Sequence, residues 1–188
     1  MPRRKNIDGE TTRDIALTWV RERPDLKSED YLYLIYLMRL GRILERIDDR
    51  RCRQTYGISG PEMRVLFALR RSGAPFARRP TDLYRAALVT SGAITKQVDR
   101  LAARELVRRL PDPKNSGGFL IQLTDKGVGV ADTSLTELAG GSPFAAGQNK
   151  LTRDERRRIL ALSERLLGEL EHRIDDMEGA SSERKPSL

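Results

Sequence analysis

Residues 91–127 combine side chains that suit contact with nucleic acid. Lys96 and Arg100 lie about one helical turn apart with Thr95 beside them, and such side chains bind phosphate oxygens or hydrogen-bond to base edges. Two short apolar runs with basic residues follow, and a stretch rich in Pro, Asn and Gly separates them. This order predicts a recognition helix followed by a basic β-hairpin.

The positive charge of the chain is concentrated around this segment. The whole sequence has 35 Lys and Arg against 27 Asp and Glu, whereas residues 60–124 alone have 12 against 5. A local excess of this kind is typical of a surface that faces phosphates, because each contacted phosphate releases condensed counterions. A basic face that is merely solvated is the alternative.

Apolar periodicity and capping residues predict the helices that hold this segment in place. The first expected helix covers Thr12–Glu22, and a long second helix begins at the N-cap Ser28, continues to about Arg53 and is ended by Gly57. Two shorter helices are expected from Ser59 to Ser72 and from Pro80 to about Ala87. Three more are expected to begin at Thr90 or Ser91, at Thr124 and at Thr152. Glu62 follows Ser59 and Glu155 follows Thr152 at the spacing of a capping box, which marks two of these starts.

Two short strands are expected at residues 106–110 and 119–123, joined by a loop too long for a two-residue turn. Three helices followed by a two-stranded hairpin describe a winged helix-turn-helix. The expected fold class is therefore mainly α, with a small β-hairpin wing and terminal dimerisation helices.

In a winged helix-turn-helix the recognition helix enters the major groove of double-stranded DNA, and the hairpin reaches the neighbouring minor groove or backbone. The expected contacts of the recognition helix are Thr90, Ser91, Thr95, Lys96 and Arg100. The expected contacts of the wing and the DNA backbone are Arg78, Arg79, Arg108, Arg109, Lys114 and Asn115.

The elements predict five regions along the chain. Residues 1–27 form an N-terminal arm with an extra helix, 28–56 a long dimerisation helix, 57–124 the DNA-binding domain, 125–176 the C-terminal dimerisation helices and 177–188 a disordered tail. The apolar stripes from Tyr31 to Ile47 and from Ile159 to Ile174 are too long for one winged domain to cover. They predict a homodimer with an isologous interface.

Three stretches, "GISGPEMRVLFAL", "TDLYRAALVTSGAITKQVDRLAARELVRRLPDP" and "IQLTDKG", resemble the MarR family of bacterial transcriptional regulators, over roughly Tyr31 to Ile174. The resemblance implies a two-fold dimer that binds a pseudo-palindromic operator. It also implies that a small, often aromatic or anionic, effector binds between the dimerisation helices and the winged domain and changes the affinity for DNA. We expect a repressor that such an effector releases from its operator.

The wing departs from the family pattern. Where the family has an Asp, one residue and then an Arg at the tip, this chain has Asn115, Ser116 and Gly117. In the family that Arg is held by the Asp corresponding to Asp99, so Asp99 has lost that partner here. Lys114 is the remaining cation at the tip, and the stem arginines Arg108 and Arg109 are expected to carry more of the binding.

The helix around Trp19 is similar to an extra helix in the urate-responsive branch of the family. Arg64 stands where that branch has an acidic residue and Gln97 where it has an Arg, which disfavours urate itself. The expected effector pocket is lined by Trp19, Tyr36, Arg39, Met63 and Phe67. Aromatic rings beside a guanidinium suit an aromatic anion, while packing of Trp19 and the tyrosines within the dimer is the alternative.

The sequence leaves two other functions open. A thiol-oxidation-responsive regulator would use Cys52, the single cysteine, whose pKa neighbouring arginines would lower if the thiol were exposed. A nonspecific architectural DNA-binding protein would share the basic charge but would not need an ordered recognition helix.

An enzyme is not expected. The single histidine, His172, has no nucleophile in a recognisable context, and no phosphate-binding glycine loop is present. One cysteine and one histidine leave little for metal chemistry, so no cofactor or metal is expected. The absence of an apolar run of membrane-spanning length and of a signal-peptide core predicts a cytoplasmic protein without a membrane partner.

Overall fold

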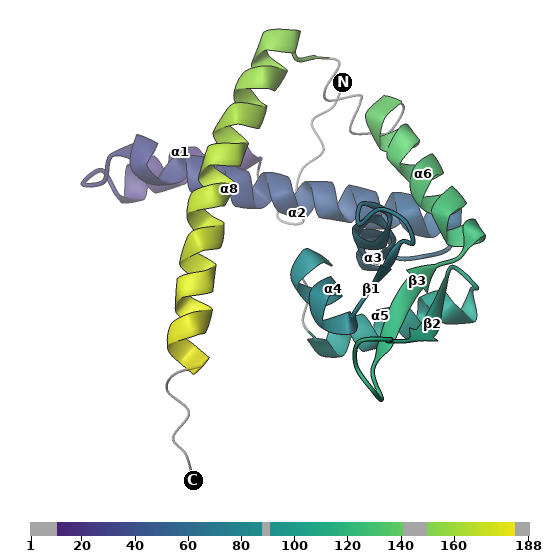
Figure 1. The fold of residues 1–188 in the computed structure, drawn as a ribbon. Coiled ribbons are helices and arrows are strands. Elements are labelled where there is room, and N and C mark those ends of the chain that lie inside the picture. The colour runs from purple at the N-terminus through teal and green to yellow at the C-terminus, as the bar shows by residue number, and fades with distance from the viewer. Residues whose placement is uncertain (1–10, 88–90, 141–149, 183–188) are drawn as a thin grey trace. The chain divides into compact units, whose positions relative to one another are not determined.

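The computed structural model of the protein describes residues 11–87, 91–140 and 150–182 (Figure 1). The chain divides into two compact units, Met1–Leu135 and Thr136–Leu188. The described part of the first unit holds the winged helix-turn-helix and the helices that precede it. None of the described helices combines the length and the apolar character needed to span a membrane.

Two helices precede the winged domain. Helix α1 covers Thr12–Glu22, as predicted, and begins with a capping box between Thr11 and Asp14. Helix α2 covers Ser28–Tyr56 and ends at Gly57, whose φ of 68° is the left-handed conformation that glycine adopts at a helix end. The predicted N-cap was wrong by one residue, because Lys27 occupies that position without a side-chain hydrogen bond.

Three helices surround the core of the first unit. Helix α3 covers Gly60–Arg70, α4 covers Pro80–Ala87 and α5 covers Ser91–Ala103. The predicted capping box of α3 is present, since the Ser59 hydroxyl accepts from the Glu62 amide and the Glu62 carboxylate accepts from the Ser59 amide. The fully buried large side chains of this core include Ile58, Met63, Leu66, Leu69, Leu83, Ile94, Leu101 and Ile121.

The wing is a three-stranded antiparallel sheet in the order β1-β3-β2. Strands β2 at Val107–Pro111 and β3 at Phe119–Leu123 form the predicted hairpin, with Arg109 opposite Ile121. Strand β1 at Ala77–Arg78 was not predicted, because two residues are too few to show an alternating pattern. Its pairing with β3 attaches the hairpin to the chain just before α4 (Figure 1).

Helix α6 covers Asp125–Gly140 and starts where β3 ends. The predicted cap is confirmed, because the Thr124 hydroxyl accepts from the amide of Gly127 at 3.1 Å. Gly127 lies so close to β2 that a side chain there would overlap the carbonyl oxygen of Leu106. The first turn of α6 is therefore packed directly against the base of the wing.

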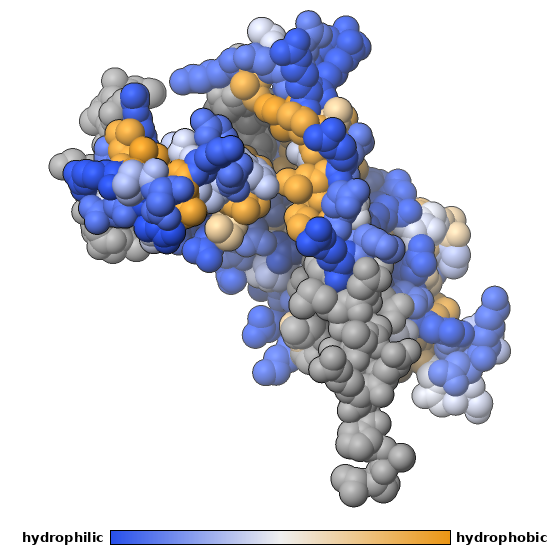
Figure 2. Space-filling view, turned by 90° about the vertical axis from the view of Figure 1, so that its left-hand side faces the viewer, coloured by the Kyte–Doolittle hydropathy of each residue, from blue (hydrophilic) through white to orange (hydrophobic). Residues whose placement is uncertain are grey.

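Helix α8 covers Arg153–Ser182 in the second unit. Its predicted capping box is present, with the Thr152 amide and hydroxyl donating to the Glu155 carboxylate. The helix continues to Ser182, so residues 177–182 belong to it and not to the predicted tail, whose remaining residues lie outside the described part of the chain. Figure 2 shows apolar side chains along the helix that leads to the C-terminal residues drawn in grey.

Candidate nucleic-acid interface

Helix α5, the predicted recognition helix, has one buried and one exposed face. Ile94, Val98 and Leu101 are at most 2% exposed, because their spacing places them on one side of the helix against the core. The opposite face exposes Thr95, Lys96, Asp99 and Arg100. The structure thus brings three of the predicted DNA contacts onto one polar surface.

The other two predicted contacts of this helix cannot be placed in the same detail. Thr90 lies outside the described residues, and so does the side chain of Ser91, although the backbone of Ser91 begins α5. Among the contacts described, Lys96 has neither a hydrogen bond nor an ion pair. Arg100 lies 3.8 Å from a carboxylate oxygen of Glu62 and keeps most of its side chain in solvent. Both cations therefore point outward with charge available for a partner.

Asp99 is paired with a residue of the wing stem and not with one at the wing tip. Arg109 Nη2 lies 2.5 Å from Asp99 Oδ1, and the guanidinium lies 5.3 Å from the ring centre of Phe119. Sequence reasoning tied the partner of Asp99 to the wing tip, whereas the stem of the wing supplies it. Phe119 was not among the predicted site residues, since a partly exposed aromatic at the start of a strand carries no local signal of this contact.

The neighbouring stem residue Arg108 is held on the other face of β2. Its Nε donates to the side-chain oxygen of Gln122 at 2.8 Å, directly across the sheet. The side-chain nitrogen Nε2 of Gln122 in turn donates to the backbone carbonyl of Pro75 at 2.9 Å. Arg109 is thus paired with the acidic Asp99, whereas Arg108 is bonded to the neutral Gln122 and its positive charge is not balanced there.

The loop between β2 and β3 closes around a buried carboxylate. Asp112 accepts from Arg79 Nε at 2.6 Å and from the amide of Lys114 at 2.9 Å, and its side chain is 3% exposed. The Arg79 guanidinium, and after it the Lys114 amide, hold the pKa of this carboxyl below its usual range. The charge of Arg79 is therefore balanced within the wing, whereas Lys114 is exposed at the tip.

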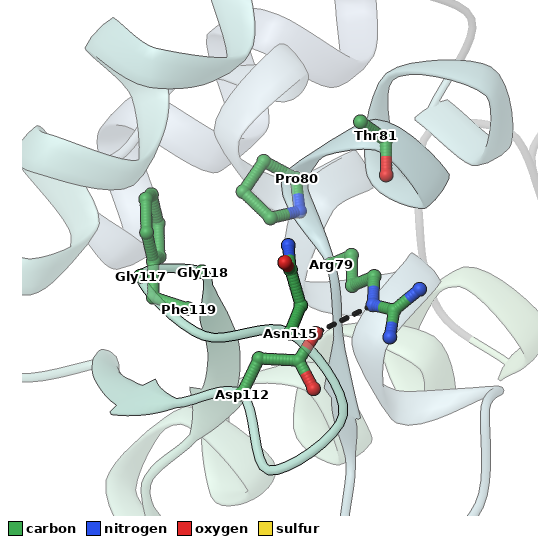
Figure 3. A pocket seen from close by; sticks show the side chains of 8 residues that line it. All are labelled: Arg79, Pro80, Thr81, Asp112, Asn115, Gly117, Gly118 and Phe119. Atoms are coloured by element: carbon green, nitrogen blue, oxygen red, sulfur yellow. Dashed lines mark hydrogen bonds and ion pairs between the residues drawn. The ribbon is translucent and has the colours of Figure 1, made fainter.

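A shallow cavity of about 200 Å³ lies between this loop and the start of α4 (Figure 3). Its lining residues are Arg79, Pro80, Thr81, Asp112, Asn115, Gly117, Gly118 and Phe119. The side chain of Asn115 points toward Pro80 across the cavity, as Figure 3 shows. Asn115 is an exposed residue of the wing tip, and its contact with DNA stays a prediction. Arg78, on β1, is exposed.

The predicted effector-pocket residues lie in different surroundings. Met63 is fully buried in the hydrophobic core, so its assignment to a pocket wall was wrong, because the side chain packs between the helices of the winged domain. Phe67 packs against the same core. Trp19 and Tyr36 are 48% and 43% exposed, and the Nε of Arg39 is buried without a hydrogen-bond partner in the described structure.

The environment of Cys52 contradicts a thiol-based sensor. The side chain is 0% exposed, and burial, followed by the nearby Asp48 carboxylate, raises the pKa of the thiol to about 11. Oxidation sensing requires an accessible thiol with a lowered pKa. The neighbouring Arg51 does reach the sulfur, with its Nη2 3.6 Å from Sγ, but it also donates to Asp48 and to the hydroxyl of Ser134, both at 2.9 Å. Its lowering effect on the thiol pKa is outweighed by burial and by Asp48.

Two guanidinium groups connect α6 to the preceding helices, and sequence reasoning did not find them. Arg51 of α2 donates to Ser134, and Arg70 of α3 pairs with Asp132 at 2.8 Å. Arg70 also lies 4.7 Å from the ring centre of Phe76. These contacts join positions far apart in the sequence, so no local pattern could have indicated them.

Comparisons with known proteins point to one class. The model of the MarR family matches residues 56–116. PecS, an HTH-type transcriptional regulator of Dickeya dadantii (strain 3937), is 33% identical over 124 residues, which cover 66% of this chain and 74% of PecS. The multiple antibiotic resistance protein MarR of Escherichia coli (strain K12) is 27% identical over 122 residues, covering 62% of this chain and 82% of MarR.

Solved structures give the same result. A mutant of E. coli MarR complexed with operator DNA is 26% identical, with a TM-score of 0.59 over 72% of this chain and 96% of that one. The reduced form of E. coli MarR has a TM-score of 0.61 at 25% identity, over 70% of this chain and 93% of that one.

Proposed function

Because the chain belongs to the MarR family of DNA-binding transcriptional regulators, we propose that it is a homodimeric repressor that a small aromatic or anionic effector releases from a pseudo-palindromic operator. The observation that carries the proposal is the exposed face of α5, where Thr95, Lys96 and Arg100 lie beside the wing. The family membership assigns the chain to regulators and not to enzymes. As a regulator of transcription, it would act in the cytoplasm, where the DNA is.

The proposed DNA contacts divide by chemistry. Thr95, Lys96 and Arg100 would reach base edges in the major groove, because they extend from the exposed face of a helix. Lys114 and Arg78 would bind phosphates, because they are exposed cations on the wing sheet and its tip. The E. coli MarR complex with operator DNA supports double-stranded DNA as the partner.

Exposed apolar side chains support the homodimer. Helices α2 and α8 expose large hydrophobic residues, among them Leu37, Met38, Leu40, Ile43, Leu44, Ile159, Leu160, Leu162, Leu167 and Leu170. A soluble protein rarely leaves such long apolar faces in water, and a second copy of the chain would cover them in an isologous interface. Residues 28–56 and 125–176 would then supply the dimerisation helices and residues 57–124 the DNA-binding domain.

The proposed effector site is near α2 and does not include Met63. Trp19 and Tyr36 offer partly exposed aromatic rings, and Arg39 has a buried donor without a described partner. An aromatic carboxylate could stack on a ring and accept from that donor. Release from DNA requires that the effector prefer a dimer whose recognition helices are wrongly spaced, and operator DNA must then weaken effector binding by the same factor.

The experiment that tests the function is selection of DNA from a random library by the purified full chain. We expect enrichment of an inverted repeat whose half-sites are about 10 base pairs apart, because a two-fold dimer presents two recognition helices. Enrichment without a shared sequence would favour the nonspecific architectural protein and refute the regulator. Sedimentation of the same sample at micromolar concentration tests the dimer, which a stable monomer would exclude.

A further inference from the structure

Arg109 joins three elements of the winged domain. Its guanidinium bonds to Asp99 on α5 at 2.5 Å and lies 5.3 Å from the ring centre of Phe119, the first residue of β3. The backbone already ties the base of the hairpin to α5, where the Leu106 amide donates to the Leu101 carbonyl at 3.0 Å. Arg109 adds a second tie to the recognition helix, farther out along the wing.

The other polar side-chain ties of the wing that are described above do not reach α5. The Arg79–Asp112 pair connects the loop of the wing to the start of α4 and does not reach α5. The tip itself carries Lys114, Asn115 and Ser116, and its amides close onto Asp112. Among the described contacts, the pair of Arg109 and Asp99 is therefore the polar side-chain link between the stem of the wing and α5, in addition to the apolar packing of Val107 in the shared core.

The charge of Arg109 is neutralised where it would meet DNA. Asp99 lies on the exposed face of α5 with 54% of its side chain in solvent, and a lone carboxylate there would repel phosphates. Paired with Asp99, Arg109 adds no net charge to the surface. Arg108, on the opposite face of the strand, is bonded to the neutral Gln122 and keeps its charge.

We propose that Arg109 is a positioning residue for DNA binding and not a phosphate contact. By holding Asp99 and the ring of Phe119, it fixes the wing at the angle to α5 at which both meet one duplex. The proposal rests on the proposed function in one respect, because it assumes that the wing and α5 bind the same operator. It replaces the expectation that Arg109 contributes its charge to DNA.

The direction in which Asp99→Asn changes the affinity for DNA separates a phosphate contact from a positioning role for Arg109. If Arg109 were a phosphate contact, Asp99→Asn would release its guanidinium, remove a repelling carboxylate and tighten binding. If Arg109 positions the wing, Asp99→Asn breaks the tie and weakens binding to the selected operator duplex. From the usual strengths of exposed ion pairs and cation–π contacts, the expected loss for Arg109→Ala is about 3- to 30-fold. Asp99→Asn and Phe119→Leu should each cause a smaller loss of operator affinity than Arg109→Ala.

The salt dependence gives a second readout. Each phosphate contact contributes about 0.9 to the slope of log affinity against log salt concentration. Arg109→Ala, Asp99→Asn and Phe119→Leu should leave the slope unchanged, while Lys114→Gln should lower it by about 0.9. A slope that falls by about 0.9 in Arg109→Ala, or unchanged or tighter binding by Asp99→Asn, would overturn the positioning role.

A double-mutant cycle supplies the matched control. In an Arg109→Ala background Asp99→Asn should no longer weaken binding, because the tie is already broken, and it should recover part of the affinity, because it removes an unpaired carboxylate that repels phosphates. It should keep its full effect in an Arg108→Ala background, which removes the same side chain from the adjacent position. Equal effects of Asp99→Asn in both backgrounds would contradict the proposal.

A measurement without DNA keeps the proposal separate from the proposed function. Amide hydrogen exchange of the free full-length protein should accelerate from Leu110 to Leu120 in Arg109→Ala, while the core amides of α3 stay protected. Unchanged exchange in the wing would refute the tie even if operator binding fell. Failure of the wild-type chain to bind any selected duplex would instead refute the proposed function and leave the exchange result to decide the tie.

Discussion

Gly127 offers a sharp test of how α6 is held against the wing. A Cβ at this position would lie 2.0 Å from the carbonyl oxygen of Leu106 and 3.1 Å from a methyl carbon of Leu123. Real Cβ atoms do not approach backbone so closely, so Gly127→Ala must push the start of α6 away from β2. The movement would strain the bond from the Thr124 amide to Leu106, which measures 3.2 Å.

The expected cost of Gly127→Ala follows from three contributions. Overpacking costs about 1–3 kcal/mol, and loss of one backbone hydrogen bond costs about 1 kcal/mol. Alanine recovers about 1 kcal/mol of helix propensity relative to glycine. We therefore expect the free energy of unfolding to fall by about 1–3 kcal/mol in urea denaturation at a fixed protein concentration.

Gly129, two residues along the same helix, is the matched control. A Cβ there meets nothing within 4 Å, and the residue is exposed. Gly129→Ala should therefore raise the free energy of unfolding by about 0.5–1 kcal/mol through helix propensity alone. If Gly127→Ala proves as stable as Gly129→Ala, the close packing of α6 on the wing base is refuted.

Four further predictions follow from the site and the helices. Lys96→Ala should cost about 1–3 kcal/mol at the selected operator and little on random DNA in titrations at one salt concentration, whereas equal losses on both would make Lys96 a phosphate contact. Cys52 should resist a thiol reagent at pH 8 in the folded protein and react after unfolding. Because burial raises the thiol pKa from 9.0 to about 11, the contribution of this thiol to stability is present below pH 9 and is lost as pH rises toward 11. Denaturation at several pH values would show this loss. Arg39→Gln should weaken release of the operator by aromatic acids or their coenzyme A thioesters, and release equal to that of the wild type would exclude Arg39 as the anchor. Leu166→Asp should give monomers in sedimentation that no longer bind the operator specifically, while a dimer of wild-type affinity would place the interface elsewhere.

Local signals in the sequence predicted most of the helices. The capping boxes at Ser59 and Thr152 and the glycine at position 57 act within a few residues, so their patterns are readable from the chain alone. The spacing of Ile94, Val98 and Leu101 likewise indicated which face of α5 is buried, and the structure confirms it. The exposed face of the recognition helix was predictable for the same reason.

Contacts between distant segments were not predictable. An alternating pattern needs several residues, so the two residues of β1 gave no signal. Apolar spacing placed Met63 on one face of α3 but could not tell a core position from a pocket wall. Resemblance to a family suggested that Asp99 needed an arginine at the wing tip, while the actual partner, Arg109, is set by the three-dimensional path of the hairpin.

The pairing of β1 with β3 has a consequence for how the protein folds during synthesis. Ala77 pairs with Gln122, so the strand that completes the wing lies before α4 and α5 in the sequence and its partner lies after them. Such non-local pairing forms late, because the loop between the strands must close first. A nascent chain can therefore form the local turns of α3, α4 and α5 soon after they emerge from the ribosome. The wing is complete only once Leu123 has left the ribosome, and until then α5 lacks the hairpin that packs beside it.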